Sequence, residues 1–147
     1  MIDLKALREN PDRFKLGAQR KGVSVDIDRV IELDSHIRSL TTERETLKAE
    51  QNRLAKESGP KIGQLMGKMK SAGGDEKAAI EAEVNELRSK PAKLKTQVSV
   101  FEEQLALLEP ELRELLLLIP LPPDEDVPVG ASADDNVELS TWAPEGY

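Results

Sequence analysis

The side chains best suited to chemistry are seven basic residues in the middle of the chain. They fall in two groups: Lys48, Arg53 and Lys56, then Arg88, Lys90, Lys93 and Lys95. Ammonium and guanidinium groups bind phosphate oxygens, so a cluster of them suits the backbone of a nucleic acid. The alternative, which composition alone favours, is that each is solvated or paired with a nearby carboxylate. The available carboxylates are Glu45, Glu50, Glu57 and Glu86.

A nucleic acid bound by these residues would be recognised through its shape and backbone. Residues 38–95 contain no aromatic side chain on which a base could stack. Duplex RNA is usually recognised in this way. The same segment holds thirteen basic and nine acidic residues, a net charge of +4, within a chain of net charge −7. Residues 98–147 hold one basic and twelve acidic residues, so the two regions are expected to have different neighbours.

The sequence contains no pattern that predicts catalysis or metal binding. There is no cysteine, and a single histidine, His36, cannot form a metal site alone. No glycine-rich phosphate loop is present. Met66 and Met69 have helical spacing and are interpreted as packing residues. We therefore predict no catalytic residue, metal or cofactor in this chain. We also expect a cytoplasmic protein, because no signal peptide or membrane-spanning run is visible.

Two heptad patterns predict the elements that position the basic residues. In a heptad, apolar residues alternate in steps of three and four along one side of a helix. The first pattern comprises Val30, Leu33, Ile37, Leu40, Leu47 and Leu54, with polar Arg44 and Gln51 at two seam positions. The second comprises Ile80, Val84, Leu87, Leu94, Val98, Phe101, Leu105, Leu108, Leu112, Leu115 and Ile119, interrupted by Pro91. Each pattern predicts a coiled-coil helix.

Gly73 and Gly74 separate the two patterns and predict a turn near 71–75. A glycine can end a helix in the left-handed conformation, and Asp75 could cap the next helix. A short turn makes the helices antiparallel neighbours, with Leu47 near Val98 or Phe101 and Leu54 near Pro91. Folding about residue 73 then places Arg53 level with Lys93 and Lys56 level with Lys90. Pairing between two chains is disfavoured, because the turn lowers the entropy cost of pairing within one chain.

Proline residues should disturb this hairpin. Pro60 and Pro91 each remove a backbone hydrogen bond, and the apolar positions shift by one residue beyond Pro60. We expect a bend or local unwinding there; the alternative is a harmless kink.

The predicted fold is all-α: a long antiparallel coiled-coil hairpin on a small helical base, with an irregular C-terminal tail. Residues 1–28 should form short base helices, with Asn10 as a cap before Pro11 and Gly22 as an end. Residues 29–119 form the arm. Residues 120–147 form a proline-rich acidic tail, with a possible short strand over 136–142 and a linker over 143–147.

Three segments resemble the N-terminal region of bacterial-type seryl-tRNA synthetases. They are MIDLKALRENPDRF at the start, RKGVSVDIDRVIELD before the arm, and IPLPPDEDVPVGASADDNVELSTW after it. The resemblance covers nearly the whole chain. Its two ends are the most specific parts, because many coiled coils share the composition of the arm.

The resemblance implies that the arm binds the long variable arm and the elbow of serine tRNA, mainly through the RNA backbone. Serylation of that tRNA would occur in a class II catalytic domain that starts after residue 147. ATP and magnesium would bind in that domain, which would also form the homodimer, so this piece would be a monomer. Pro60 and Pro91 are unusual in such an arm. The alternative function is a structural coiled-coil hairpin that binds another protein.

Overall fold

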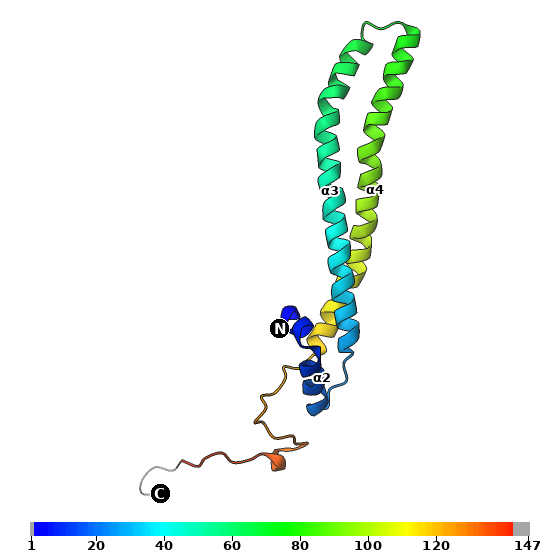
Figure 1. The fold of residues 1–147 in the computed structure, drawn as a ribbon. Helices are drawn as coiled ribbons and strands as arrows, with labels where there is room; N and C mark the ends of the chain where they lie inside the picture. The colour runs from blue at the N-terminus through cyan, green and yellow to red at the C-terminus, as the bar shows by residue number, and fades with distance from the viewer. Residues whose placement is uncertain (1, 143–147) are drawn as a thin grey trace. The chain divides into compact units, whose positions relative to one another are not determined.

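The computed structural model describes residues 2–142, and its regular structure is helical. The elements are α1 (Leu4–Glu9), α2 (Pro11–Arg20), α3 (Ile27–Met69), α4 (Gly74–Leu118) and a short 3₁₀ helix, η1 (Ala133–Asp135). The chain divides into two units. The arm unit is Glu32–Arg113, and the base unit contains the residues up to Ile31 and from Glu114 onward. In the arm unit α3 and α4 run side by side in opposite directions, which confirms the predicted all-α hairpin (Figure 1).

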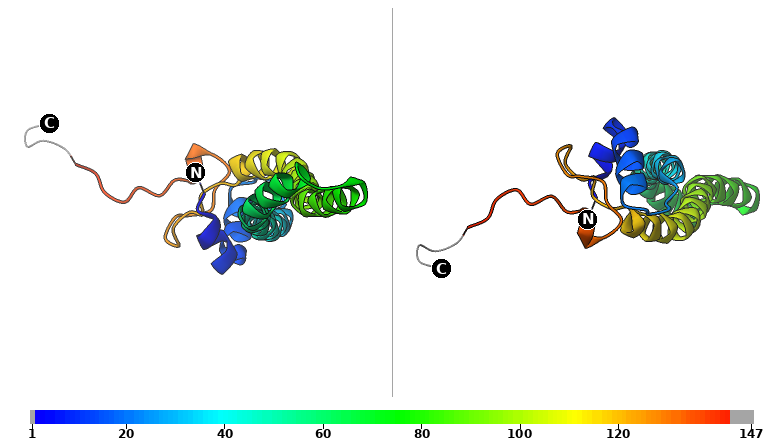
Figure 2. Two further views of the ribbon diagram at one scale, coloured as in Figure 1. Left: turned by 90° about the horizontal axis from the view of Figure 1, so that it is seen from above. Right: turned by 90° about the horizontal axis from the view of Figure 1, so that it is seen from below.

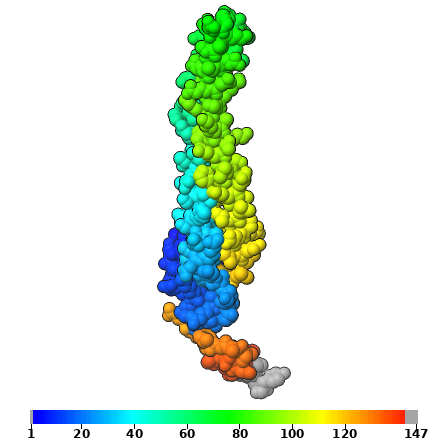
Figure 3. Space-filling view, turned by 90° about the vertical axis from the view of Figure 1, so that its right-hand side faces the viewer, coloured from blue at the N-terminus to red at the C-terminus, as the bar shows by residue number. Residues whose placement is uncertain are grey.

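The arm unit is held together by one apolar seam between α3 and α4. The buried seam residues are Leu33, Leu40, Ile80, Val84, Val98, Leu105 and Leu112. Burying a leucine or valine side chain contributes about 1.5–3 kcal/mol, so this row is the main stabilising term of a unit that has no other core. Figure 3 shows the side chains of the two helices meeting along the arm.

The register of the seam agrees with the predicted pairing. Leu47 and Phe101 line one hollow between the helices, with a volume of about 240 Å³. Leu54 and Pro91 line another, with a volume of about 200 Å³. Both predicted neighbour pairs are therefore confirmed, and the two helices pair without a slip over this span.

Polar residues occupy every second seam position of α3 over this span: Arg44, Gln51 and Ser58 alternate with Leu47 and Leu54. The Arg44 side chain is 29% exposed, and its Nη2 lies 3.7 Å from Glu45 Oε1. Its Nε is buried without a hydrogen-bond partner among the residues that the structure describes. Ser58 is buried, and its hydroxyl donates to the Leu54 carbonyl. Such polar layers weaken a seam but can fix its register and its partner.

A bend or local unwinding was expected at the two arm prolines, and the unwinding does not occur. Helical structure is continuous through Pro60 in α3 and through Pro91 in α4. Each proline removes only one backbone bond of a helix that is 43 or 45 residues long. Packing of the remaining turns along the seam holds the helix in place on both sides of the proline.

The reversal at the end of the arm differs in detail from the prediction. α3 ends at Met69 in 3₁₀-type bonds, from Lys70 N to Gly67 O and from Ser71 N to Lys68 O, at 3.3 and 3.1 Å. Neither central glycine has a positive φ angle. α4 begins at Gly74 with Lys77 N bonded to Gly73 O at 2.8 Å. Asp75 therefore lies inside the first turn of α4, where its charge favours the helix N-terminus, and does not cap it.

In the base unit, the two short helices α1 and α2 pack against each other (Figure 2). Hydrogen bonds at its two ends fix where α2 begins and ends. Asn10 Oδ1 accepts from Arg13 N at 3.2 Å, so Asn10 caps α2 before Pro11 as predicted. Gly22, with φ 65°, ends α2 in the left-handed conformation. There Val23 N bonds to Ala18 O at 2.9 Å and Gly22 N to Gln19 O at 3.1 Å. This pair of bonds is the Schellman arrangement.

The small core of the base unit and its contact with the tail are built from the same helices. Its buried apolar residues include Leu7, Phe14, Ala18, Ile27, Val30 and Ile119. Pro122 of the tail packs directly on Gly17, where an added Cβ would lie 2.8 Å from Pro122 Cα. Arg20 Nη2 donates to the Val127 carbonyl at 2.6 Å. Two contacts therefore hold this part of the tail against α2.

The expected strand over 136–142 is not formed. A strand needs a neighbouring strand to accept its backbone hydrogen bonds, and residues 2–142 contain none. Leu139 and Trp142 are 93% and 87% exposed. The expected linker over 143–147 lies outside the described residues. Within residues 2–142, no helix is both long and apolar enough to cross a membrane.

Shortening Leu105 to alanine should lower the free energy of unfolding by about 2–5 kcal/mol, because it removes buried seam contacts and leaves a cavity. Leu105 is 3% exposed, whereas Leu107 on the same helix is 76% exposed. Leu107→Ala is therefore a matched control and should change the stability by less than about 0.5 kcal/mol. Urea unfolding followed by circular dichroism measures both. Equal effects would contradict the assigned seam.

Glycine replacements should have opposite effects in the two units. Gly22→Ala should destabilise the chain by about 1–2 kcal/mol, because alanine is strained at a positive φ angle. Gly63→Ala should stabilise it by about 1 kcal/mol, because alanine favours a helix and the added Cβ meets nothing within 4 Å. Thermal unfolding of the two variants would give melting temperatures on opposite sides of the parent value. A shift in the same direction would show that one of these backbone descriptions is wrong.

Candidate nucleic-acid interface

The seven predicted basic residues all lie on the arm unit, and all are exposed. Those on α3 are Lys48, Arg53 and Lys56, and those on α4 are Arg88, Lys90, Lys93 and Lys95. Leu54 of α3 lies beside Leu87 and Pro91 of α4, so the two groups occupy the same part of the hairpin. Folding therefore brings together charges that are separated in the sequence.

Two of the seven cations are neutralised by carboxylates of their own helix. Arg53 lies between two glutamates, with Nη2 2.7 Å from Glu50 Oε1 and Nη1 3.0 Å from Glu57 Oε1. Its Nε donates to the other oxygen of Glu50 at 2.8 Å. Lys90 Nζ lies 3.1 Å from Glu86 Oε1. For these two residues the alternative interpretation, a surface ion pair, describes the structure.

The hydrogen bonds between Arg53 and Glu50 shift the pKa of both side chains. The Glu50 carboxylate and its charge raise the pKa of Arg53, with a smaller contribution from Glu57. In return, the hydrogen bond from Arg53 lowers the pKa of Glu50 below its ordinary value. Both side chains are solvent-exposed, so the ion pair contributes little to the free energy of unfolding.

The other five cations make no ion pair with any residue of 2–142. They are Lys48, Lys56, Arg88, Lys93 and Lys95. Glu45, the carboxylate that could have paired with Lys48, lies against Arg44 instead. An exposed cation without a carboxylate partner can bind an external anion without first breaking an internal bond. These five residues are therefore available to an external anion, and which of them meets one depends on the side of the arm that each occupies.

Lys61 was not among the seven candidates, although it lines the same hollow as Lys90, Leu54 and Pro91. The signal for it was present in the sequence, because Lys61 follows Leu54 by one heptad and so lies near the seam. Sequence reasoning gave more weight to clusters of charge than to heptad position.

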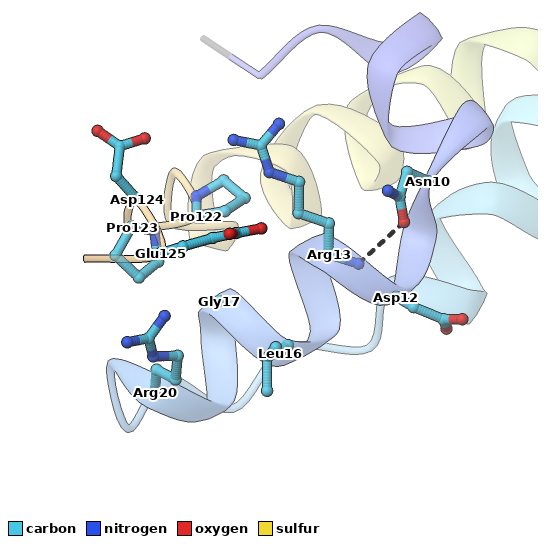
Figure 4. Close-up of a pocket in the computed structure, with 10 residues that line it drawn as sticks. All are labelled: Asn10, Asp12, Arg13, Leu16, Gly17, Arg20, Pro122, Pro123, Asp124 and Glu125. Carbon is cyan, nitrogen blue, oxygen red and sulfur yellow. Dashed lines mark hydrogen bonds between the residues drawn. The ribbon is translucent and has the colours of Figure 1, made fainter. Parts of the chain in front are cut away.

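A second hollow lies in the base unit, between α2 and residues 122–125, with a volume of about 710 Å³ (Figure 4). Arg13 and Arg20 line it from the helix, and Asp124 and Glu125 line it from the tail. Arg20 is already bonded to a backbone carbonyl. Charges of both signs line this hollow, so it does not match a ligand of one sign. In residues 2–142, no group of three or more His, Asp or Glu side chains is placed to hold a metal ion.

Replacing Arg53 with glutamine should raise the pKa of Glu50 toward its ordinary value, because the main cause of its lowering is removed. A lowered folded-state pKa means that the pair stabilises the folded chain above the unfolded pKa of glutamate. This contribution is lost as the pH falls through the folded-state pKa. Carboxyl NMR titration measures the shift, with Lys93→Gln as the control that should leave Glu50 unmoved. An unchanged Glu50 titration in Arg53→Gln would contradict the ion pair.

Comparison with known proteins identifies the family of this chain. The sequence model of the seryl-tRNA synthetase N-terminal domain matches residues 1–122. A serine–tRNA ligase of Thermosynechococcus vestitus is 40% identical over 145 residues, which are 99% of this chain and 31% of that protein. One of Bordetella avium is 40% identical over 144 residues, 98% of this chain and 28% of that protein. A third, of Synechococcus sp. (strain JA-3-3Ab), is 38% identical over 142 residues, 97% of this chain and 30% of that protein.

The chain thus spans about a third of the length of these relatives. The match covers the base helices and both helices of the arm. On the family match and the extent of the aligned sequence, this chain belongs to the seryl-tRNA synthetase N-terminal domain family.

Proposed function

We propose that the arm unit binds serine tRNA and holds it for serylation, as the tRNA-binding arm of a serine–tRNA ligase. The observation that carries this proposal is the presence, on the arm of a chain in this family, of five exposed basic side chains without carboxylate partners among residues 2–142. Their number and exposure support binding to the phosphate backbone of an RNA.

Recognition by the arm depends on shape. At about 1.5 Å per residue, the arm unit extends roughly 55 Å, which is long enough to follow an RNA helix over more than one turn of its backbone. The only aromatic side chain of the arm unit, Phe101, is half-buried at the seam and so is poorly placed to stack on a base. We therefore assign to the arm the long variable arm and the elbow of serine tRNA, because these set that tRNA apart by form.

The chemistry is assigned to the part of the relatives that this chain does not span. The arm performs no chemical step; it contributes affinity and position. The catalytic domain would bind ATP, magnesium and serine, join serine to the tRNA, and form the homodimer. The assignment of binding to the arm and of catalysis to another domain is supported by the family and by the fraction of the relatives' length that the chain covers.

Two exposed apolar side chains favour the alternative, a hairpin that binds another protein. Val100 and Leu107 are 48% and 76% exposed, and they lie one heptad apart on α4. Gln104 and the charged Glu103 lie between them on the helix surface. Substituting Val100 and Leu107 together with glutamate separates the two functions, because it should abolish binding of a protein here and leave binding of RNA to the basic region intact.

The proposed function predicts that this chain binds serine tRNA more tightly than a tRNA with a short variable arm. The difference should be about tenfold or more in Kd, because fewer phosphates of the short-armed RNA can reach the basic residues. Binding should also weaken steeply with salt, with log K falling by about 0.7–0.9 per phosphate contact for each unit of log salt. Fluorescence anisotropy with labelled tRNAs at several salt concentrations measures both. Equal affinity for the two tRNAs would contradict shape selection, and no binding at low salt would contradict the proposed function.

A further inference from the structure

The seam between α3 and α4 divides the surface of the arm unit into two faces. A side chain that directly follows a seam leucine lies on one side of the seam, because each residue turns the helix by about 100°. A side chain that directly precedes the next seam position lies on the other side. Two antiparallel helices are related by a twofold rotation, so each of these positions falls on the same side in both helices.

We call these surfaces face 1 and face 2. Each face includes the side chains next to the seam on one side and the neighbouring row of side chains farther from the seam on that same side. Face 1 comprises Lys48, Asn52, Ala55, Gly59, Asn85, Arg88, Ala92, Lys95 and Ser99. Face 2 comprises Glu50, Arg53, Glu57, Glu86, Lys90, Lys93 and Gln97. Lys56 points away from the seam at the back of α3 and belongs to neither face.

Face 1 carries cations and no carboxylate. Lys48, Arg88 and Lys95 follow the seam residues Leu47, Leu87 and Leu94, and none of the three cations makes an ion pair within residues 2–142. Its other six residues are uncharged, so face 1 has a charge of +3. The nearest carboxylate at an equivalent position is Glu45, three residues before Lys48, and it lies against Arg44. Glu81 and Glu102 lie one heptad from Arg88 and Lys95, respectively, at positions that follow a seam isoleucine and a seam phenylalanine.

Face 2 carries as many cations, but its own carboxylates balance them. Its three basic and three acidic residues give a net charge of zero. Arg53 is held by Glu50 and Glu57, and Lys90 is held by Glu86. A phosphate that approached this face would meet carboxylates at close range and would have to displace them from their partners.

We propose that the arm binds RNA through face 1 alone, with Lys48, Arg88 and Lys95 on the sugar–phosphate backbone and face 2 turned away from it. This inference rests on the proposed function and adds the side of the hairpin that the RNA occupies. Charge complementarity names the occupant: a surface of charge +3 without carboxylates fits a polyanion.

The uncharged residues of face 1 add a steric reason. Ala55, Gly59, Ala92 and Ser99 have short side chains, and a Cβ added at Gly59 would meet nothing within 4 Å. A backbone can therefore approach the helices closely while the longer basic side chains reach past it. Arg88 and Lys95 are seven residues apart, which is about 10 Å along α4. They can contact separate phosphates of one strand.

The test compares two triple variants of this chain that change the net charge equally. The first, Lys48→Gln with Arg88→Gln and Lys95→Gln, removes the cations of face 1. The matched control, Arg53→Gln with Lys90→Gln and Lys93→Gln, removes those of face 2. Binding of serine tRNA is measured by fluorescence anisotropy, and circular dichroism verifies that both variants keep the helicity of the parent.

We expect the face 1 variant to lose tenfold or more in affinity and the face 2 variant to lose less than about threefold. The salt slope of log K should shrink by about 2–3 in the face 1 variant, as three phosphate contacts are removed, and stay unchanged in the control.

Three other outcomes overturn the inference in distinguishable ways. Equal losses of affinity would show that RNA contacts both faces, so the one-sided assignment would fall while RNA binding by the arm stands. A loss confined to the face 2 variant would place the RNA on the opposite side. Unchanged binding in both variants would contradict the arm as the RNA-binding element, and with it the proposed function.

Discussion

The antiparallel contact between α3 and α4 is the constraint on which the other features of the arm depend. Neither helix has another element to pack on within the arm unit, so burial of Leu40, Val84, Val98 and Leu105 in one seam is what keeps the pair together. The seam also fixes the level of each residue along the hairpin. Basic residues about 40 positions apart in the sequence occupy one region because Leu54 of α3 lines the same hollow as Leu87 and Pro91 of α4.

Ion pairing on this surface is decided within each helix. Arg53 finds its carboxylates three residues before and four residues after itself, and Lys90 finds Glu86 four residues before. Arg88 and Lys95 have no acidic residue at any of these distances. The helical repeat makes such neighbours the natural partners, so an arm can combine a neutral face with a charged face without any contact across the seam.

Much of this arrangement could be predicted from the sequence, and the predictions that were wrong have identifiable physical causes. Strong periodicity predicted the two long helices, and the capping chemistry of Asn10 and Gly22 predicted the limits of α2. Local signals in the arm were less reliable. Pro60 and Pro91 suggested unwinding, but long helices packed along a seam tolerate the loss of single bonds.

The glycines at the turn marked the reversal but not its geometry, because a turn of this length can close without a positive φ angle. The types of the basic residues predicted the candidate site. They did not predict which of these cations form ion pairs and which do not. Glu45 shows why spacing alone is insufficient. It stands three residues before Lys48, but it pairs with Arg44, whose side chain is partly buried at the seam.

The polar positions of the α3 seam have a consequence for the assembly of more than one chain. Arg44, Gln51 and Ser58 each face an apolar or proline-containing stretch of α4, so the two helices are unlike partners. Two copies of α3 aligned in parallel would stack each polar residue on its twin and would set one guanidinium against another. Parallel pairing of two α3 helices is thereby disfavoured relative to closure of α3 on α4 of the same chain.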